Sequence, residues 1–287
     1  MSQTLRDLLA TGADASSALT APGGTALTFG ALRALVADTV ATLNRLGIGR
    51  NDRVGIVLPN GPEMATAFVA VASGSTSAPL NPGYRADEFE FYLSDLNAKA
   101  LLVEAGSTSP ALEVARKLGV RIIELLAHPQ LGAGSFELRD ASPASAARPA
   151  QGGFAQPDDV ALVLHTSGTT SRPKIVPLSH RNVCASARNI REFLSLSPND
   201  RGLNIMPLFH IHGLIAGVLA PLSAGGQVCC TPGFNALRFF GWMEQARPTW
   251  YTAVPTMHQA ILGRAANNKA VIAASPLRFI RSSSSAM

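Results

Sequence analysis

The chain has 287 residues, 47% of them hydrophobic and 15% charged, with a formal net charge of +5. This length is sufficient for a large core and suggests about two domains. The 24 lysines and arginines form no basic run, which argues against a nucleic-acid surface. No apolar run reaches the roughly 20 residues that span a bilayer, and the N-terminus has no signal-peptide pattern. We therefore expect a cytoplasmic protein that binds neither nucleic acid nor membrane.

Between residues 28 and 126, helical patterns alternate with short apolar runs. Helices are predicted at 28–46, 63–73, 86–97 and about 108–118, and strands at 53–58, 77–80, 100–104 and 120–126. Strands that alternate with helices join through right-handed crossovers and form a mostly parallel sheet. The first predicted strand is not followed by Gly-x-Gly-x-x-Gly, so a dinucleotide fingerprint is missing. The expected fold class is α/β.

Residues 127–157 have a different composition, dominated by Ala, Ser, Pro and Gly. Such a segment has few side chains that could pack, so we predict a surface loop or linker. We place a subdomain boundary at its end, with a first α/β subdomain at 1–157 and a second at 158–287. In the second, helices are predicted at 180–194, 213–223, 237–246 and from 255, and strands at 201–206, 227–231, 249–254 and 277–281.

The three cysteines of the chain are Cys184, Cys229 and Cys230. They form no Cys-x-x-Cys pair, and neighbouring cysteines rarely bridge each other. We therefore expect reduced, buried thiols in a cytosolic protein, and neither disulfides nor metal ligands.

A short polar stretch follows the apolar run at 162–164. It contains Thr166, Ser167, Gly168, Thr169, Thr170 and Lys174. Gly168 has no Cβ and lets the backbone approach an anion, while successive N–H groups and hydroxyls can donate to phosphate oxygens. Lys174 adds a mobile positive charge, and a helix capped by Ser179 starts nearby with its N–H groups facing outward. These features fit a phosphate-binding loop, but for a generic cluster of this composition a Ser/Thr turn between two strands is the favoured interpretation.

The loop is not a Walker A motif, because Lys174 precedes Ile175 and not Ser or Thr. It resembles the phosphate-binding signature of the adenylate-forming superfamily, which includes acyl-CoA synthetases, luciferases and peptide-synthetase adenylation domains. That signature reads Thr/Ser-Ser-Gly-Thr-Thr-Gly-x-Pro-Lys-Gly, and Ser171 and Ile175 stand where it has glycine. The surrounding Thr-Ser-Arg-Pro-Lys and Val-Pro-Leu are similar to the oxalate–CoA ligase branch. Residues 27–32 and 77–84 resemble scaffold motifs of the same superfamily.

Two histidines lie in the segment Pro-Leu-Phe-His-Ile-His-Gly at 207–213. Alternate residues of an extended segment point the same way, so His210 and His212 could face one cavity. The residues alone leave open that both are ordinary hydrogen-bonded histidines. A metal site is disfavoured, because no third ligand lies at a useful spacing. The string Pro-Leu-Phe-His-x-x-Gly-Leu resembles the acyl-pocket motif of acyl- and aryl-CoA synthetases.

The resemblance implies an ATP-dependent acid–CoA ligase that uses ATP, Mg²⁺ and CoA. A carboxylate attacks the α-phosphate of ATP, pyrophosphate leaves, and the CoA thiol then displaces AMP from the acyl-adenylate. The residues implied to hold the ATP phosphates are Thr166, Ser167, Gly168, Thr169, Thr170 and Lys174, with Thr170 also a ligand of Mg²⁺. Those implied to line the acyl pocket are His210, His212, Gly213 and His258. Since imidazole can donate to a carboxylate, a second histidine at 212 suits oxalate or another short dicarboxylate.

Two alternatives remain open for this chain. A fatty acid or an aryl acid would be favoured by a large apolar cavity beside His210. A non-catalytic module that binds a nucleotide or another anion is an alternative of a different class. Arg278 and Arg281 could pair with phosphate or carboxylate, but we expect them to be ordinary strand-edge charges.

Members of the superfamily are much longer than this chain. The adenine-pocket motif with its Mg-binding glutamate, the ribose-binding aspartate, the hinge and the C-terminal domain with its catalytic lysine have no counterpart here. The resemblance implies the stacked, mostly parallel α/β subdomains of a large N-terminal domain, truncated before its end. Its partner would be the missing C-terminal portion, and we assign no catalytic residue and expect no turnover by this chain alone. An uncovered strand edge and apolar surface favour self-association.

Overall fold

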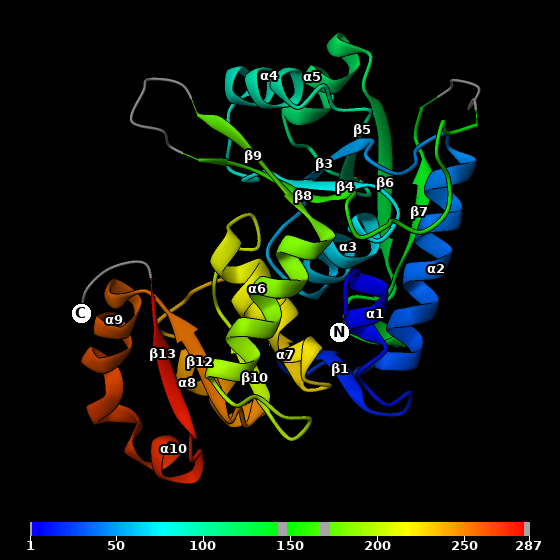
Figure 1. The fold of residues 1–287 in the computed structure, drawn as a ribbon. Coiled ribbons are helices and arrows are strands. Elements are labelled where there is room, and N and C mark those ends of the chain that lie inside the picture. The colour runs from blue at the N-terminus through cyan, green and yellow to red at the C-terminus, as the bar shows by residue number, and fades with distance from the viewer. Residues whose placement is uncertain (1, 143–147, 167–172, 284–287) are drawn as a thin grey trace.

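The computed structural model describes residues 2–142, 148–166 and 173–283, whose strands form two sheets (Figure 1). The first sheet has the strand order β7 (Phe136–Asp140), β6 (Arg121–Ala127), β5 (Ala100–Glu104), β3 (Arg53–Val57), β4 (Thr76–Pro79), β8 (Val160–Thr166) and β9 (Lys174–Ser179). The second has the order β13 (Phe279–Ser282), β12 (Trp250–Ala253), β10 (Arg201–Asn204), β11 (Gln227–Cys230), β1 (Ser17–Thr20) and β2 (Leu27–Thr28). Neighbouring strands are parallel except in the pairs β6–β7, β8–β9 and β1–β2. The prediction of an α/β fold with mostly parallel sheets is confirmed.

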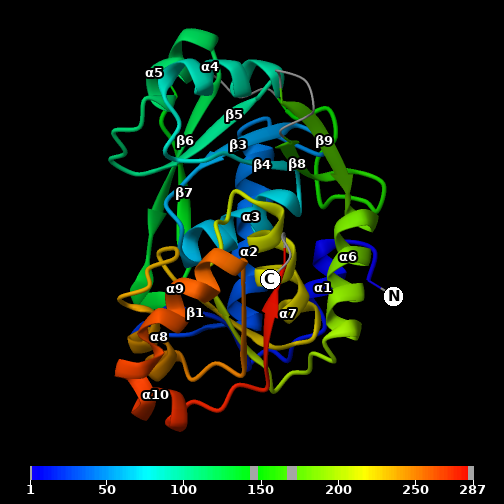
Figure 2. The same ribbon diagram turned by 90° about the vertical axis from the view of Figure 1, so that its left-hand side faces the viewer.

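Helices cover the faces of both sheets (Figure 2). They are α1 (Leu5–Leu9), α2 (Phe29–Arg45), α3 (Pro62–Ala72), α4 (Ala86–Asp95), α5 (Ala111–Leu118), α6 (His180–Phe193), the π-helix η2 (His212–Leu219), α7 (Ala220–Ser223), α8 (Phe239–Ala246), α9 (Pro255–Ala265) and α10 (Lys269–Ala274), with short 3-10 turns η1 (Pro129–Leu131) and η3 (Ala266–Asn268). Among the described residues, none of these helices combines the length and the apolarity that crossing a membrane requires.

The helix α3 lies at the centre of the molecule, between the two sheets. It contacts β4 and β8 of the first sheet and β11 of the second, and every residue from Met64 to Ala72 is buried. Helices α4 and α5 pack on the outer face of the first sheet through Phe89 and Val114. Helix α8 covers the outer face of the second sheet through Phe239 and Met243. Burial of apolar area in these layers is the main favourable contribution to folding.

The three cysteines lie in this interior. Cys184, Cys229 and Cys230 are buried and unbridged, as predicted. Burial raises the pKa of Cys184 to about 12 and that of Cys229 to about 11. Both thiols are therefore protonated at neutral pH, which leaves them poor nucleophiles.

The prediction that 127–157 is an unpacked linker is wrong for its first part. Strand β7 pairs antiparallel with β6, with Phe136 opposite Ala127 and Asp140 opposite Ile123. Phe136 is buried, and Leu138 packs against the same core. The segment Phe-Glu-Leu-Arg-Asp alternates apolar and polar residues, which is the pattern of a strand with one buried face. The average composition of the longer segment concealed this short alternation.

The strands of each sheet come from both sides of the boundary predicted at 157/158. Strands β1 and β2, together with α1, were not predicted, and β1 pairs parallel with β11 in the second sheet. Strand β8 pairs with β4 in the first sheet, so the chain crosses between the sheets twice. The boundary itself stays a prediction.

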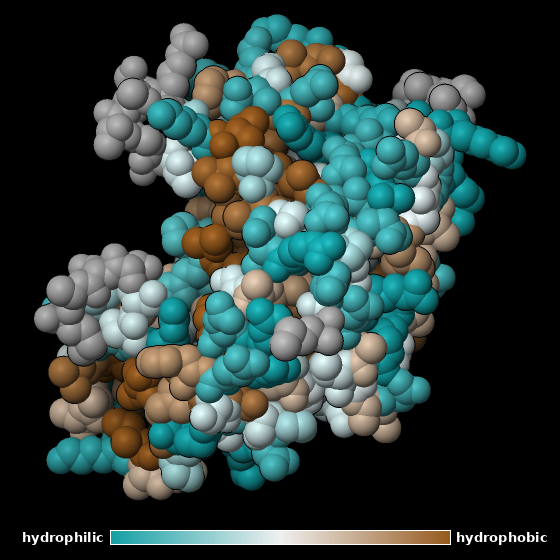
Figure 3. All heavy atoms as spheres, viewed as in Figure 1, coloured by the Kyte–Doolittle hydropathy of each residue, from teal (hydrophilic) through white to brown (hydrophobic). Residues whose placement is uncertain are grey.

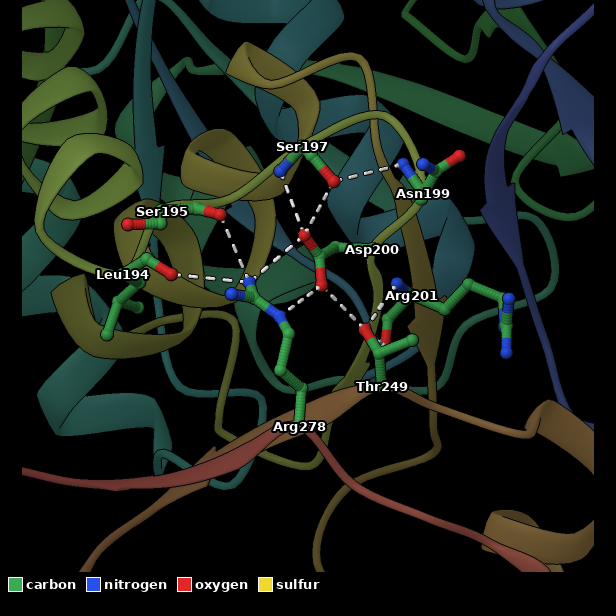
Figure 4. A network of polar contacts seen from close by, with 8 residues as sticks. All are labelled: Leu194, Ser195, Ser197, Asn199, Asp200, Arg201, Thr249 and Arg278. Carbon is green, nitrogen blue, oxygen red and sulfur yellow. Dashed lines mark hydrogen bonds and ion pairs between the residues drawn. The ribbon is translucent and has the colours of Figure 1, made fainter.

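A polar network fastens the amino end of β13 to the rest of the second sheet (Figure 4). Arg278 donates from Nε and Nη2 to the two carboxylate oxygens of Asp200, each at 3.0 Å. Its Nη2 also donates to the backbone oxygens of Leu194 and Ser195, each at 3.2 Å, at the end of α6. Thr249 donates to Asp200 at 2.9 Å. These contacts join α6, β10, β12 and β13, and so set where the remainder of β13 lies.

Candidate functional site

The predicted phosphate loop joins the two strands of a hairpin. In that hairpin β8 and β9 are antiparallel, and their last paired residues are Thr166 and Lys174. Both residues are exposed. Ser167, Gly168, Thr169 and Thr170 lie outside the described residues. The contacts of the loop with phosphate and with Mg²⁺ therefore stay predictions.

The helix that follows the hairpin does not present free N–H groups to the loop, so that expectation is wrong. Strand β9 places the start of α6 six residues, roughly 20 Å, beyond the loop. The first N–H groups of α6 already have partners: His180 N donates to Asp159 O and Arg181 N to Pro157 O, each at 3.0 Å. Ser179 accepts from the next N–H group and caps the helix. This helix start therefore serves the fold.

A histidine that was not predicted supports the hairpin from the other side. His165 Nε2 lies 3.0 Å from Asp95 Oδ2 on α4, and its ring packs edge-on against Tyr92 at a centroid distance of 4.6 Å. Burial lowers the pKa of His165 and outweighs the opposing effect of Asp95. Since β8 and α4 are far apart in sequence, no local pattern could have indicated this contact.

The two histidines of 207–213 differ in environment. The segment is a turn that leads into a helix, and Ile211 already has helical angles (φ −53°, ψ −36°). The expectation of an extended segment is therefore wrong. His210 is exposed, whereas His212 is buried at the first position of η2. His210 Nδ1 accepts from His212 N at 3.2 Å, so the two residues are neighbours even though their rings differ in burial.

The structure explains why η2 starts at this position. Asn204, the last residue of β10, donates from its side chain to the backbone oxygen of Gly213 at 3.2 Å. A Cβ on Gly213 would lie 2.2 Å from Pro207 O, and one on Gly217 would lie 2.6 Å from the Asn204 amide. Small residues are required at both positions. The chain thereby packs η2 directly onto the carboxyl end of β10.

His212 takes part in a buried polar cluster. Its Nε2 lies 2.6 Å from Thr252 Oγ1 and 3.0 Å from Arg281 Nη1. A guanidinium only donates, so Nε2 accepts and the proton of the neutral ring is on Nδ1. Burial, with the Arg281 charge as the next cause, lowers the pKa of His212 to about 4. The ring is therefore neutral near pH 7, and Nδ1 has no hydrogen-bond partner in the described part of the chain.

Arg281 was expected to be an ordinary strand-edge charge, and the structure contradicts that expectation. Its backbone pairs with that of Thr252 across β12 and β13, which puts the two side chains on the same face. Its Nη1 donates to Thr252 Oγ1 at 3.0 Å. None of the ion pairs within the described ranges includes Arg281. Burial lowers the pKa of its guanidinium.

His258 does not join this cluster. Its Nδ1 lies 3.3 Å from the hydroxyl of Tyr251, and Tyr251 points to the opposite face of β12 from Thr252. On that face, β12, β13 and the helices α8 to α10 enclose a pocket of about 640 Å³. The pocket is lined mainly by apolar side chains, including Phe240 and Ile280, and by His258. The roles of His210, His212, Gly213 and His258 in an acyl pocket stay predictions.

Comparison with known proteins places the chain in a family. Residues 10–287 match the family described as AMP-binding enzyme. The chain is 42% identical over 275 residues to an oxalate–CoA ligase from Arabidopsis thaliana, covering 94% of this chain and 53% of the relative. It is 37% identical over 258 residues to an oxalate–CoA ligase from Saccharomyces cerevisiae, covering 83% of this chain and 47% of the relative.

A solved structure shows the same fold. ATP-bound MatB from Rhodopseudomonas palustris superposes with a TM-score of 0.79 at 23% identity, covering 99% of this chain and 55% of MatB. The chain thus spans about half the length of the relatives that it matches. On these grounds the chain belongs to the family of AMP-binding, adenylate-forming enzymes.

Proposed function

We propose that this chain is part of an ATP-dependent ligase that joins oxalate or another short dicarboxylate to CoA. The observation that carries the proposal is the similarity to oxalate–CoA ligases from a plant and a yeast. Identity near 40% supports the reaction class more strongly than the substrate. The polar cluster around His212 favours a small and charged acid.

In the proposed reaction, ATP, the acid and CoA are substrates. An oxygen of the acid attacks the α-phosphate of ATP, and the bond from that phosphorus to the pyrophosphate oxygen breaks. The CoA thiolate then attacks the acyl carbon of the adenylate, and AMP leaves. Thr166 and Lys174, at the mouth of the hairpin, would hold the β- and γ-phosphates, because an ammonium group offsets charge that develops on the departing pyrophosphate.

The proposed use of Mg²⁺ rests on Thr170 and on the ATP phosphates. Thr170 lies outside the described residues, and the described ranges contain no group of three His, Cys, Asp or Glu side chains suited to a metal. Mg²⁺ would offset phosphate charge when it is bound together with ATP. The positioning of ATP by Lys174 is proposed independently of the ion.

A fatty acid or an aryl acid is the second candidate substrate. The observation in its favour is the apolar pocket of about 640 Å³ beside His258. Neither His210 nor His212 lines that pocket, so it lies apart from the segment that resembles the acyl-pocket motif. We therefore rank a bulky acid below a short dicarboxylate.

The test is pyrophosphate release from ATP in the presence of CoA and one acid at a time. Oxalate, malonate, octanoate, coumarate and acetate form the panel, and the 287-residue chain is compared with a form of the protein at the length of its relatives. We expect release with oxalate by the long form only, and loss of that release in Lys174→Ala. Release with octanoate or coumarate instead would keep the ligase class and overturn the dicarboxylate.

Turnover by the short chain would contradict the expectation that it is inactive alone. Binding of ATP without any release by the long form would favour the non-catalytic module.

A cytoplasmic location stays a prediction from the sequence. Self-association also stays a prediction. Strand β13 pairs on one side only within the described residues, and Ile280 is 55% exposed there.

A further inference from the structure

Arg281 carries a positive charge for which the described residues supply no carboxylate partner. We propose that Arg281, with Thr252 and His212, binds a carboxylate of the substrate acid, at the end of the acid that is not adenylated. This inference rests on the proposed function and names the residues that would select a dicarboxylate over a monocarboxylate.

The first argument is the charge balance around the guanidinium. Arg281 is partly buried, and its described contacts are to neutral groups: His212, Thr252 and, at 3.4 Å, the hydroxyl of Ser283. Arg50 provides a contrast, because it donates to Asp159 at 2.6 Å and that contact raises its pKa. Burial without a carboxylate has the opposite effect on Arg281. A buried cation is normally paired, so an anionic ligand would supply the missing charge.

The second argument is the set of donors at this point. A guanidinium has five N–H donors in one plane, which match the two oxygens of a carboxylate. Arg281 uses Nη1 for His212 and Thr252 and Nη2 for a long contact to Ser283. Its Nε makes no hydrogen bond with another described residue. His212 is 94% buried and keeps an unpartnered donor at Nδ1. The Nε of Arg281 is therefore the spare donor beside the one positive charge of the cluster, and a single carboxylate can take both.

The third argument is the location of the cluster in the fold. Arg281 and Thr252 lie toward the carboxyl ends of β13 and β12, where ligands of open α/β sheets bind. Strand β13 runs toward the part of the molecule that carries the β8–β9 hairpin (Figure 1). On that side the surface is hollowed between the part that carries the hairpin and the part that carries β13 (Figure 3). A small acid held by Arg281 would thus lie on the same side of the molecule as Lys174.

A phosphate group is the competing occupant of the cluster. Phosphates carry more charge than a carboxylate and favour several cations or a run of backbone N–H groups. The cluster offers one cation and neutral donors, whereas the hairpin offers Lys174 beside a loop rich in hydroxyl groups. The carboxylate is the better match, and the experiment separates the two by measuring the binding of oxalate and of ATP.

The experiment uses Arg281→Gln and Arg281→Lys, with Arg264→Gln as the matched control. Arg264 is exposed on α9, so its replacement removes the same charge away from the cluster. Binding of oxalate and of ATP to the 287-residue chain is measured by calorimetry. The KM and kcat for oxalate are measured by pyrophosphate release in the long form. Thermal unfolding checks that each variant is folded.

We expect Arg281→Gln to weaken oxalate binding, and to raise its KM, at least about tenfold, as loss of a charge-assisted hydrogen bond does. ATP binding should not change, and kcat should change less than KM. Arg281→Lys should recover part of the affinity, because it keeps the charge and loses the planar donors. Arg264→Gln should match the unaltered chain.

Oxalate binding of normal strength by a folded Arg281→Gln would overturn the inference and leave the proposed function standing. Loss of ATP binding with unchanged oxalate binding would also overturn it, in favour of a phosphate. Pyrophosphate release by the unaltered long form with octanoate, and none with oxalate, would instead overturn the proposed substrate.

Discussion

Two arginines near β13, Arg278 and Arg281, differ in the charge of the groups that they contact. Arg278, just before the strand, reaches both oxygens of a buried aspartate and two backbone oxygens. Arg281, inside the strand, reaches only neutral groups among the described residues. The first charge thus has a carboxylate partner, whereas the part of the chain that the structure describes gives the second no counter-ion. The charge of the groups that an arginine contacts is therefore a better guide to whether it stabilises the fold or binds a ligand than its place in the sequence.

The largest expected effect is the loss of the satisfied arginine. Arg278→Ala would leave Asp200, which is 4% exposed, without its cation. Removing one partner of a fully buried pair costs about 3 to 5 kcal/mol. Because the Arg278 side chain is 41% exposed, we expect the free energy of unfolding to fall by an amount at the lower end of that range, about 3 kcal/mol. Urea unfolding measures it. Arg278→Lys should lose less, because the charge remains, and an equal loss would show that charge is not what matters.

A smaller effect should follow from the buried histidine beside Arg281. The folded pKa of His212 is about 4, below its value of about 6.5 in an unfolded chain. Between these values the unfolded chain binds more protons, so stability is complete above pH 6.5 and falls as the pH drops toward 4. We expect a loss of about 2 kcal/mol from this group between pH 7 and pH 5.

Urea unfolding of the unaltered chain and of His212→Asn, over that range, measures the contribution. The pKa values of His165 and His180 are also lowered, mainly by burial. They act equally in both proteins, so the difference between the two pH profiles belongs to His212. Identical profiles would mean that His212 is not held neutral.

The hydroxyl of Thr252 should contribute less to the free energy of unfolding than His212 does. Thr252 is 1% exposed and contacts both Arg281 and His212. Thr252→Val keeps its shape and removes the hydroxyl, which should cost about 1 kcal/mol of unfolding free energy. Thr252→Ser, which retains the hydroxyl but leaves a small void, is the comparison. A valine variant as stable as the original would show that the cluster adds nothing to the fold.

The smallest effect is expected at the unsatisfied arginine itself. Arg281→Gln loses the three hydrogen bonds of the guanidinium but also removes a partly buried charge, and these contributions oppose each other. We expect the free energy of unfolding to stay within about 0.5 kcal/mol of the original. A loss as large as that of Arg278→Ala would make the two arginines equivalent and remove the basis of the comparison.

The sequence predicts those parts of the molecule that depend on nearby residues. The helix after Thr28 is an example, because its cap and its buried positions Leu32, Val36 and Leu43 all lie within one segment. Strands β3, β5 and β12 are marked by short apolar runs between turns. The parallel arrangement then follows from their alternation with helices.

The parts that escaped prediction depend on distant residues. Strand β1 lies between β11 and β2 in the second sheet, and Ser17 to Thr20 show little pattern of their own. The cluster of His212, Thr252 and Arg281 requires the register of β12 with β13 and the start of η2. The residues next to Arg281 in the sequence do not indicate its contacts with His212 and Thr252, which are 69 and 29 residues away. The hydroxyl-rich loop was recognisable from its residues, and its contacts remain predictions.

The place of β1 in the second sheet has a consequence for how the chain folds as it is made. Residues 17–20 leave the ribosome early, and their parallel partner at 227–230 is synthesised much later. At about 5 to 20 residues per second, the interval is roughly 10 to 40 s. During that time Ala18 and Leu19, both buried in the final structure, have β2 as their one partner strand of the described second sheet. The apolar side chains of β1 in a nascent chain of this fold therefore stay without their parallel partner until most of the second sheet has been synthesised.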